Sequence, residues 1–154
     1  MANRVALGLP LVLAGGALAS QYLGGLHPCE MCHWQRWPHY AAIVAAAFAS
    51  PAPVPARRAL VTLAAVLIAA SGAIGVFHAG VEYGWWQGIT ACTSMIRPTG
   101  DTRTMLDQIM SAPVIRCDVA QWRLLGVSLA GFNAILSIGG AAAILRLAAQ
   151  RSGR

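Results

Sequence analysis

Long apolar segments separated by short polar ones constrain the fold of this chain more than any other feature. Residues 5–26, 59–81 and 122–145 are each long enough, as helices rising 1.5 Å per residue, to cross a hydrocarbon core about 30 Å thick. Hydrophobic residues make up 57% of the chain and charged residues 10%, whereas a soluble domain has about 25% charged residues because its surface faces water. The sequence therefore predicts a single membrane domain over residues 1–154.

A fourth, shorter span is predicted at residues 37–50. By length alone this segment could also be a buried or interfacial helix. An even number of spans is needed, however, for the charges to sort as described below. We therefore expect an all-α protein with a four-transmembrane-helix bundle. Its two outer loops would cover residues 27–36 and 82–121.

The first apolar run allows a second interpretation. A secretory signal peptide has a basic residue before an apolar stretch and small residues at its cleavage site, and Arg4 and Ala17-Leu18-Ala19 have this character. The apolar run continues beyond that point to Leu26. The later spans would hold the protein in the membrane in either case.

The charged residues sort onto two sides of such a bundle, and all eleven basic residues are arginines. The side that holds both termini carries only basic residues: Arg4, Arg57, Arg58, Arg146, Arg151 and Arg154. The other side carries Arg36, Arg97, Arg103, Arg116 and Arg123 together with all five acidic residues. The positive-inside rule makes the first side cytoplasmic, so both termini are cytoplasmic and both outer loops periplasmic. No basic run is interleaved with aromatic residues, so we expect no nucleic-acid partner.

All four cysteines fall in the predicted outer loops. Cys29 and Cys32 lie in the short loop, and Cys92 and Cys117 lie in the long one. An oxidising compartment such as the bacterial periplasm permits disulfides there. Four cysteines allow three pairings, and sequence alone does not choose among them. The spacing favours a local Cys29–Cys32 pair and a separate Cys92–Cys117 pair.

Three uses of these cysteines are open. In a non-catalytic membrane scaffold, disulfides would only brace the loops, but a CxxC bridge closes a very short loop and removes little unfolded-state entropy. In a metal-binding membrane protein, His27 and His33 beside the CxxC motif could help to hold zinc, but neither Cys92 nor Cys117 lies in a tight zinc knuckle. The third use is redox chemistry.

The surroundings of the CxxC motif favour redox chemistry. Pro28, just before Cys29, suits the first turn of a helix, whose N-terminus stabilises a thiolate. Arg36 lies about one turn beyond Cys32 and adds a full positive charge. An arginine at the start of a span is costly unless its side chain reaches the interface or has a role. Such a role would be to hold a thiolate or the carbonyl oxygen of a quinone.

These residues resemble the DsbB family of bacterial disulfide-bond formation proteins. The resemblance is carried by PCEMCHWQR at residues 28–36, ACTSMI at 91–96 and VIRCD at 114–118, together with the four predicted spans. Its most specific part is the CxxC motif with Arg36 and a second cysteine pair in the next outer loop. The resemblance implies an enzyme, a thiol–quinone oxidoreductase of the bacterial inner membrane. Its cofactor would be ubiquinone or menaquinone, and its partner a periplasmic DsbA-like thioredoxin-fold dithiol oxidase.

The resemblance also implies a role for each cysteine. We expect no metal ligands. Cys92 would be attacked by the partner's thiolate and form a mixed disulfide. Cys117 would then be released and attack Cys29. Cys32 would become the thiolate that faces the quinone, with Arg36 supporting this charge and orienting the ring.

The histidines divide into two groups at this stage. His78, near the outer end of the third span, resembles a family position close to the quinone; its alternative is an interfacial histidine hydrogen-bonded to the backbone. His27, His33 and His39 are expected at the membrane interface, where neighbouring Trp and Tyr residues would form an aromatic belt.

Two connecting segments carry local predictions. Residues 51–55, Pro-Ala-Pro-Val-Pro, are expected to be a stiff, non-helical link. Residues 101–112 are expected to form a short amphipathic helix on the membrane surface, with Met105, Leu106, Ile109 and Met110 on one face.

Overall fold

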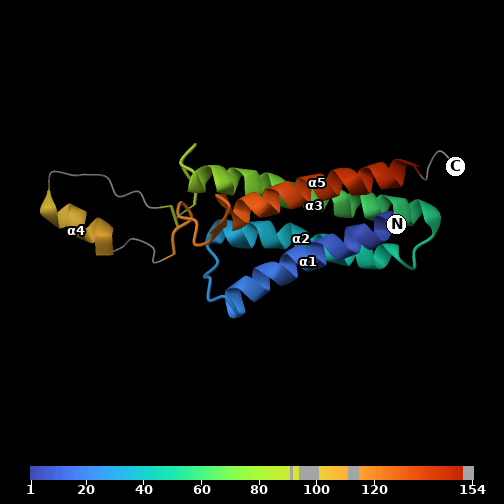
Figure 1. The fold of residues 1–154 in the computed structure, drawn as a ribbon, viewed down its shortest axis with the longest axis horizontal. Helices are drawn as coiled ribbons and strands as arrows, with labels where there is room; N and C mark the ends of the chain where they lie inside the picture. Colours follow the sequence, from blue (N-terminus) through green and yellow to red (C-terminus); the bar gives the residue numbers. More distant parts are fainter. Residues whose placement is uncertain (91, 94–100, 111–114, 151–154) are drawn as a thin grey trace.

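The computed structural model is built around four long helices that lie side by side along one axis (Figure 1). They are α1 (Ala2–Tyr22), α2 (Glu30–Ala49), α3 (Val54–Glu82) and α5 (Leu129–Gln150). The structure describes residues 1–90, 92–93, 101–110 and 115–150. Among the long helices, α3 packs against α2 and α5, and α1 packs mainly against α2 and α5. The predicted helical bundle is therefore confirmed over the described residues.

Three of these helices, α1, α3 and α5, are long and apolar enough to cross a membrane. Helix α2 has 20 residues but begins at Glu30, inside the predicted outer loop, and carries Gln35, Arg36 and His39 in its first half. These polar residues lower its hydropathy. That α2 lies within the bundle is clear from its packing, whereas its role as a fourth span stays a prediction.

Helix α5 begins later than the predicted start of the last span at Trp122. Residues 123–128 instead form an antiparallel hairpin of β1 (Arg123–Leu124) and β2 (Val127–Ser128). Leu125 and Gly126 form the turn with φ values of 51° and 80°. Two successive positive φ values match the twist of a tight two-residue hairpin. The all-α prediction is thus wrong for this short segment.

The proline-rich link is shorter than expected. Helix α3 begins at Val54, with Pro53 as its N-cap and Pro55 in its first turn. Proline is tolerated there because the first amide groups of a helix have no intrahelical acceptor. The non-helical prediction is therefore wrong for the last two residues of the link.

Small residues hold the helices close together at the end of the bundle away from the cysteines. Ala42, Ala46, Ala64 and Ala65 are fully buried where α2 meets α3. Farther along α3, a Cβ at Gly72 would lie 2.8 Å from Cγ1 of Ile138 on α5. Small residues allow such close backbone approach between helices in lipid. Large apolar side chains instead point outward, as expected for a surface that faces lipid: Phe48, Val66, Ile135 and Leu136.

The chain termini and the links between helices divide between the two ends of the bundle (Figure 1). The N-terminus, the α2–α3 link and the end of α5 lie at one end, and the α1–α2 link, the end of α3 and the hairpin lie at the other. This grouping matches the predicted charge sorting, although Arg97, Arg151 and Arg154 lie outside the described residues. Which end faces the periplasm stays a prediction.

Helix α4 (Thr102–Met110) lies beyond the end of the bundle that carries the hairpin, apart from the four long helices (Figure 1). Asp101 precedes it and accepts hydrogen bonds from the main-chain N–H and the hydroxyl of Thr104, at 3.1 and 2.6 Å. Such a bond satisfies one of the free amides at a helix N-terminus. The predicted helix is confirmed over residues 102–110, and its position on a membrane surface stays a prediction.

Candidate active site

The CxxC motif stands at the N-terminus of α2. Cys29 has extended backbone angles and is the N-cap, and its Sγ accepts a hydrogen bond from the main-chain N–H of Cys32 at 3.3 Å. The two sulfurs are 2.9 Å apart, and both thiols are free. Pro28 lies one residue before the N-cap rather than in the first turn. The expected placement of a thiol pair at a helix N-terminus is otherwise what the structure shows.

The two thiols, which lie outside the predicted span at residues 37–50, differ in acidity. The thiol of Cys29 donates to the Cys32 sulfur, which raises the pKa of Cys29 and lowers the pKa of Cys32. Burial opposes the lowering of the Cys32 pKa, whereas a hydrogen bond with the main chain of Cys29 and the charge of Arg36 favour it. Cys32 is therefore the sulfur that ionises first, which makes it the nucleophile of the pair.

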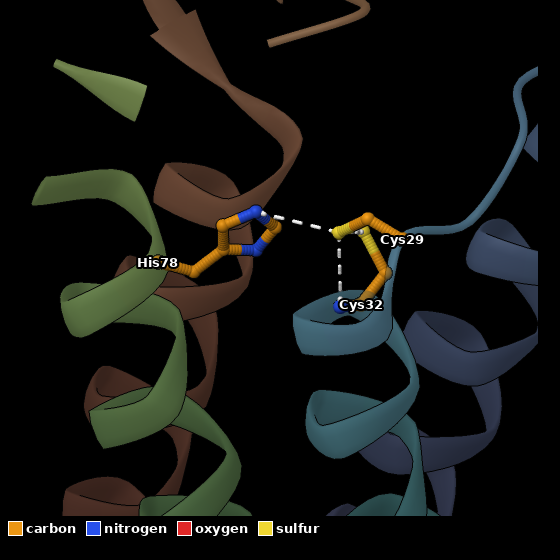
Figure 2. Close-up of side chains that lie close together, drawn as sticks. All are labelled: Cys29, Cys32 and His78. Atoms are coloured by element: carbon orange, nitrogen blue, oxygen red, sulfur yellow. Dashed lines mark hydrogen bonds between the residues drawn. The ribbon is translucent and has the colours of Figure 1, made fainter. Parts of the chain in front are cut away.

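His78 reaches the thiols from the neighbouring helix α3. Figure 2 shows its ring pointing from α3 toward the two sulfurs at the start of α2. Nε2 of His78 lies 3.6 Å from Sγ of Cys29 and 3.7 Å from Oε1 of Glu82. On the other side of the ring, Nδ1 lies 2.7 Å from the side-chain amide nitrogen of Gln35. His78 is thus buried in contact with the thiol pair rather than exposed at an interface.

The second cysteine pair lies in the same region. Cys92 and Cys117 form a disulfide, and both belong to one buried cluster with Cys29, against which Cys32 also packs. The hydroxyl of Thr90 lies 3.0 Å from Sγ of Cys92 and donates to Sγ of Cys117 at 3.4 Å. All four cysteines therefore meet at one end of the bundle.

The two loops that carry the cysteines are joined directly. The side-chain oxygen of Gln121 accepts from the main-chain N–H of His27 at 2.9 Å, and its amide nitrogen donates back to the His27 carbonyl. These paired bonds connect residues that are far apart in the sequence. They hold the segment before Cys29 against the segment after Cys117.

A cavity of about 390 Å³ adjoins the thiol pair. Its polar lining includes Cys29, Cys32, Arg36 and His78, and α1 and α5 supply apolar walls such as Leu13, Phe132 and Leu136. Mainly apolar cavities of about 300–1,000 Å³ with a few polar groups are typical small-molecule sites. Apolar walls with a cationic hydrogen-bond donor suit a lipid-soluble ring that carries carbonyl oxygens. The lining therefore fits a quinone.

Arg36 is buried beside this cavity, with 9% of its surface exposed. Its guanidinium donates to Oε1 of Gln21 at 2.6 Å and to the main-chain oxygen of Ala17 at 3.1 Å, both on α1. The side chain therefore does not extend to the interface. Its hydrogen bonds within the described residues go to α1 rather than to Cys32, so its support of the thiolate acts through charge.

Comparison with known proteins bears on this arrangement. The family model for disulfide bond formation protein DsbB matches residues 1–147. The chain belongs to the DsbB family. An uncharacterised protein of Rickettsia prowazekii (strain Madrid E), RP370, is similar to it, with 25% identity over 138 residues that cover 88% of this chain and 80% of that protein. No solved structure matches. DsbB membership confirms the resemblance and indicates a membrane oxidoreductase of disulfide-bond formation.

Within this DsbB-family chain, the structure brings together the residues singled out from sequence. Cys29, Cys32 and His78 have their ligand atoms within 4.8 Å of one another. His27 and His33, the zinc ligands considered from sequence, are exposed and do not belong to this group. The metal-binding interpretation therefore survives only with His78 in their place.

Sequence reasoning missed a buried polar network between α2, α3 and α5. Nε2 of His39 hydrogen-bonds Oδ1 of Asn133 at 2.9 Å and lies 2.9 Å from the hydroxyl of Ser71. His39 is 3% exposed, so its expected position at the interface is wrong. The available signal was the helical spacing of polar residues inside apolar segments, since Gln35 and His39, like Asn133 and Ser137, are one turn apart.

Proposed function

We propose that this chain is a thiol–quinone oxidoreductase of the bacterial inner membrane. It takes electrons from a periplasmic DsbA-like thioredoxin-fold dithiol oxidase and passes them to ubiquinone or menaquinone. The observation that carries this proposal is the gathering of both cysteine pairs in one buried cluster beside a cavity lined by Cys32, Arg36 and His78. Loops 27–36 and 82–121 would then face the periplasm.

The first exchange takes place at the Cys92–Cys117 disulfide. A thiolate of the partner attacks Sγ of Cys92, a partner–Cys92 bond forms, and Cys117 leaves with the electron pair. Exposure supports this direction, because Cys92 is 9% exposed and Cys117 is 0% exposed. The hydroxyl of Thr90, which donates to Sγ of Cys117, stabilises the leaving thiolate. The partner's second thiolate then displaces Cys92, and the partner leaves oxidised.

The second exchange moves the electron pair between loops. When Cys29 and Cys32 are disulfide-bonded, the Cys117 thiolate attacks Sγ of Cys29 and Cys32 leaves as a thiolate. Cys92 then attacks Cys117, which re-forms the Cys92–Cys117 disulfide and releases Cys29. The structure has the arrangement expected after these steps, with Cys92 and Cys117 bonded and the other two thiols free.

The last step returns the Cys29–Cys32 pair to the disulfide. A quinone bound in the cavity would supply the oxidant: it would take the two electrons of the pair, together with the proton of the Cys29 thiol and one proton from solution, and leave as a hydroquinone. Cys32 provides the thiolate at the cavity wall, and the Arg36 guanidinium provides a fixed positive charge there. The apolar side chains of α1 and α5 keep water from this wall.

The proposal is tested with purified protein, reduced thioredoxin-fold oxidase and quinone, by following quinone reduction optically. We expect Cys32→Ser to abolish turnover because it removes the thiolate at the cavity. His33→Ala is the matched control, because His33 is the exposed neighbour of Cys32 and lies outside the thiol group. Full quinone-reducing turnover by Cys32→Ser would refute the mechanism.

A metal-binding function is the second candidate, and one observation favours it. The sulfurs of Cys29 and Cys32 and a nitrogen of His78 lie close enough together to share one ion. Two thiolates and an imidazole are typical zinc ligands. Stoichiometric zinc in protein purified without chelator, with thiols protected from alkylation until the metal is stripped, would support this function.

A further inference from the structure

The hydrogen bonds around Gln35 determine how its amide is oriented. The amide nitrogen lies 3.2 Å from the main-chain oxygen of Met31, which can only accept. The amide oxygen accepts from Nδ2 of Asn133 at 2.8 Å. Asn133 is itself oriented, because Nδ2 lies 3.2 Å from the main-chain oxygen of Ser71. If the Gln35 amide were flipped, its oxygen would face the Met31 main-chain oxygen and its nitrogen would face Nδ2 of Asn133, and neither pair could form a hydrogen bond.

This orientation decides which nitrogen of His78 carries the proton. The same amide nitrogen of Gln35 lies 2.7 Å from Nδ1 of His78 and donates to it, so Nδ1 is the acceptor. A neutral imidazole has one N–H and one lone pair. The proton therefore lies on Nε2.

The surroundings of Nε2 agree with this assignment. Nε2 faces a carboxylate oxygen of Glu82 at 3.7 Å and the sulfur of Cys29 at 3.6 Å, and both can accept. An N–H directed at two acceptors is favourable, whereas a lone pair in that position would be repelled by the carboxylate. The two sides of the ring thus point independently to the same tautomer.

We propose that Gln35 is a positioning residue that holds His78 as the Nε2–H tautomer, which directs a hydrogen-bond donor at Cys29 and withholds the lone pair from a metal ion. The hydrogen bonds then run in one direction, from His78 N–H to the Cys29 thiol and from that thiol to the Cys32 sulfur. Each donor polarises the next, which strengthens the last bond. This deepens the proposed function, since the chain of bonds ends on the sulfur that the function uses.

The same tautomer opposes metal binding at the thiols. Zinc binds histidine through a nitrogen lone pair, and the other ring nitrogen then donates its N–H to a carboxylate or carbonyl oxygen. Here that other nitrogen, Nδ1, faces a donor instead of an acceptor. Cys29, Cys32 and His78 therefore have the ligand types of a zinc site. The group beside Nδ1 of His78, however, is the hydrogen-bond donor of Gln35, whereas a zinc-bound histidine needs an acceptor there.

The tautomer can be measured directly in the unaltered protein. Nitrogen NMR of histidine-labelled, reduced, quinone-free protein distinguishes Nε2–H from Nδ1–H, and His78→Gln identifies the signal by its loss. We expect the Nε2–H form for His78. Finding the Nδ1–H form in the wild-type protein would overturn the proposal.

Zinc affinity of the reduced protein provides the second measurement. In Gln35→Glu, the carboxylate can accept a hydrogen bond from Nδ1–H, which favours the other tautomer of His78 and leaves the lone pair on Nε2. We expect zinc affinity, measured by chelator competition, to rise about 10- to 100-fold, the size of effect that such neighbouring groups have. Ser137→Ala is the control, because Ser137 donates to Asn133 at 2.9 Å but does not contact His78. Equal zinc affinity in the wild type and Gln35→Glu would overturn the proposal.

The two proposals can fail separately. The tautomer and zinc measurements need neither quinone nor a partner protein. If the wild-type protein showed no quinone reduction, the proposed function would be refuted and the proposed role of Gln35 would be unaffected. Conversely, tight zinc binding by the wild type would refute the role of Gln35 and support the metal-binding alternative.

Discussion

Replacing Cys29 by Ala removes the hydrogen bond that lowers the pKa of the Cys32 thiol. The sulfurs lie 2.9 Å apart, and this bond is the largest contribution to that lowering. A hydrogen bond to a charged group contributes about 1.5–3 kcal/mol. The pKa of Cys32 should therefore rise, and at 1.36 kcal/mol per factor of ten its thiolate fraction at a pH below that pKa should fall by about 10- to 100-fold. Cys29→Ser is the matched comparison, because serine keeps both a hydroxyl donor and a helix N-cap.

The assay is the pH dependence of iodoacetamide alkylation in a background where Cys92 and Cys117 are replaced by Ser. Cys32 is then the sole thiol in both the Ala and the Ser variant at position 29. Below the thiol pKa, the alkylation rate follows the thiolate fraction, so it should be about 10- to 100-fold lower for Cys29→Ala than for Cys29→Ser. Equal midpoints in the two variants, or a lower midpoint in Cys29→Ala, would refute the assignment of Cys29 as donor to Cys32.

Three further predictions test other parts of the molecule. Arg36→Ala should raise the quinone KM more than it changes kcat, because it removes a charge at the cavity wall; an unchanged KM in steady-state kinetics would count against that role. Gln121→Leu should slow turnover with the partner protein while leaving dithiothreitol-driven quinone reduction unchanged, because it removes the hydrogen bonds from the Gln121 side chain to the main chain of His27 that join the two loops. Equal losses of rate in both assays would contradict this. Gly72→Ala should lower the free energy of unfolding in detergent by about 1–3 kcal/mol, because its Cβ would lie 2.8 Å from a side chain of α5. Gly139→Ala should leave that free energy unchanged, because the space around Gly139 is open, and equal values for the two variants would argue against close packing of α3 and α5 at Gly72.

The sequence was most informative where structure depends on local chemistry. A proline followed by CxxC predicts a helix start, and Cys29 is indeed the N-cap of α2. The apolar runs likewise predict α1, α3 and α5, because lipid requires helices of a certain length and composition. The meeting of the two cysteine pairs followed only from the family resemblance.

Other features depend on partners that sequence does not reveal. From sequence, His39 resembled an interfacial residue because aromatic residues flank it. In the structure its Nε2 has hydrogen-bond partners inside the bundle, Ser71 on α3 and Asn133 on α5. The hairpin before α5 was missed for a local reason. Its sequence is apolar enough to continue a span, and Leu125 occupies a positive-φ position where glycine or asparagine would have signalled a turn.

The bare backbone at Gly75 has a consequence well outside its own contact. A methyl group at this position would lie 3.1 Å from Nδ2 of Asn133 and 3.0 Å from the main-chain oxygen of Ala130. Asn133 reaches Gln35 from α5 only because α3 leaves this space open. The missing side chain of Gly75 thus allows α5 to come close enough for Asn133 to orient Gln35, and Gln35 in turn determines which nitrogen of His78 carries the proton. Even alanine at position 75 would therefore alter the acid–base chemistry of the Cys29–Cys32 pair, which residue 75 does not contact.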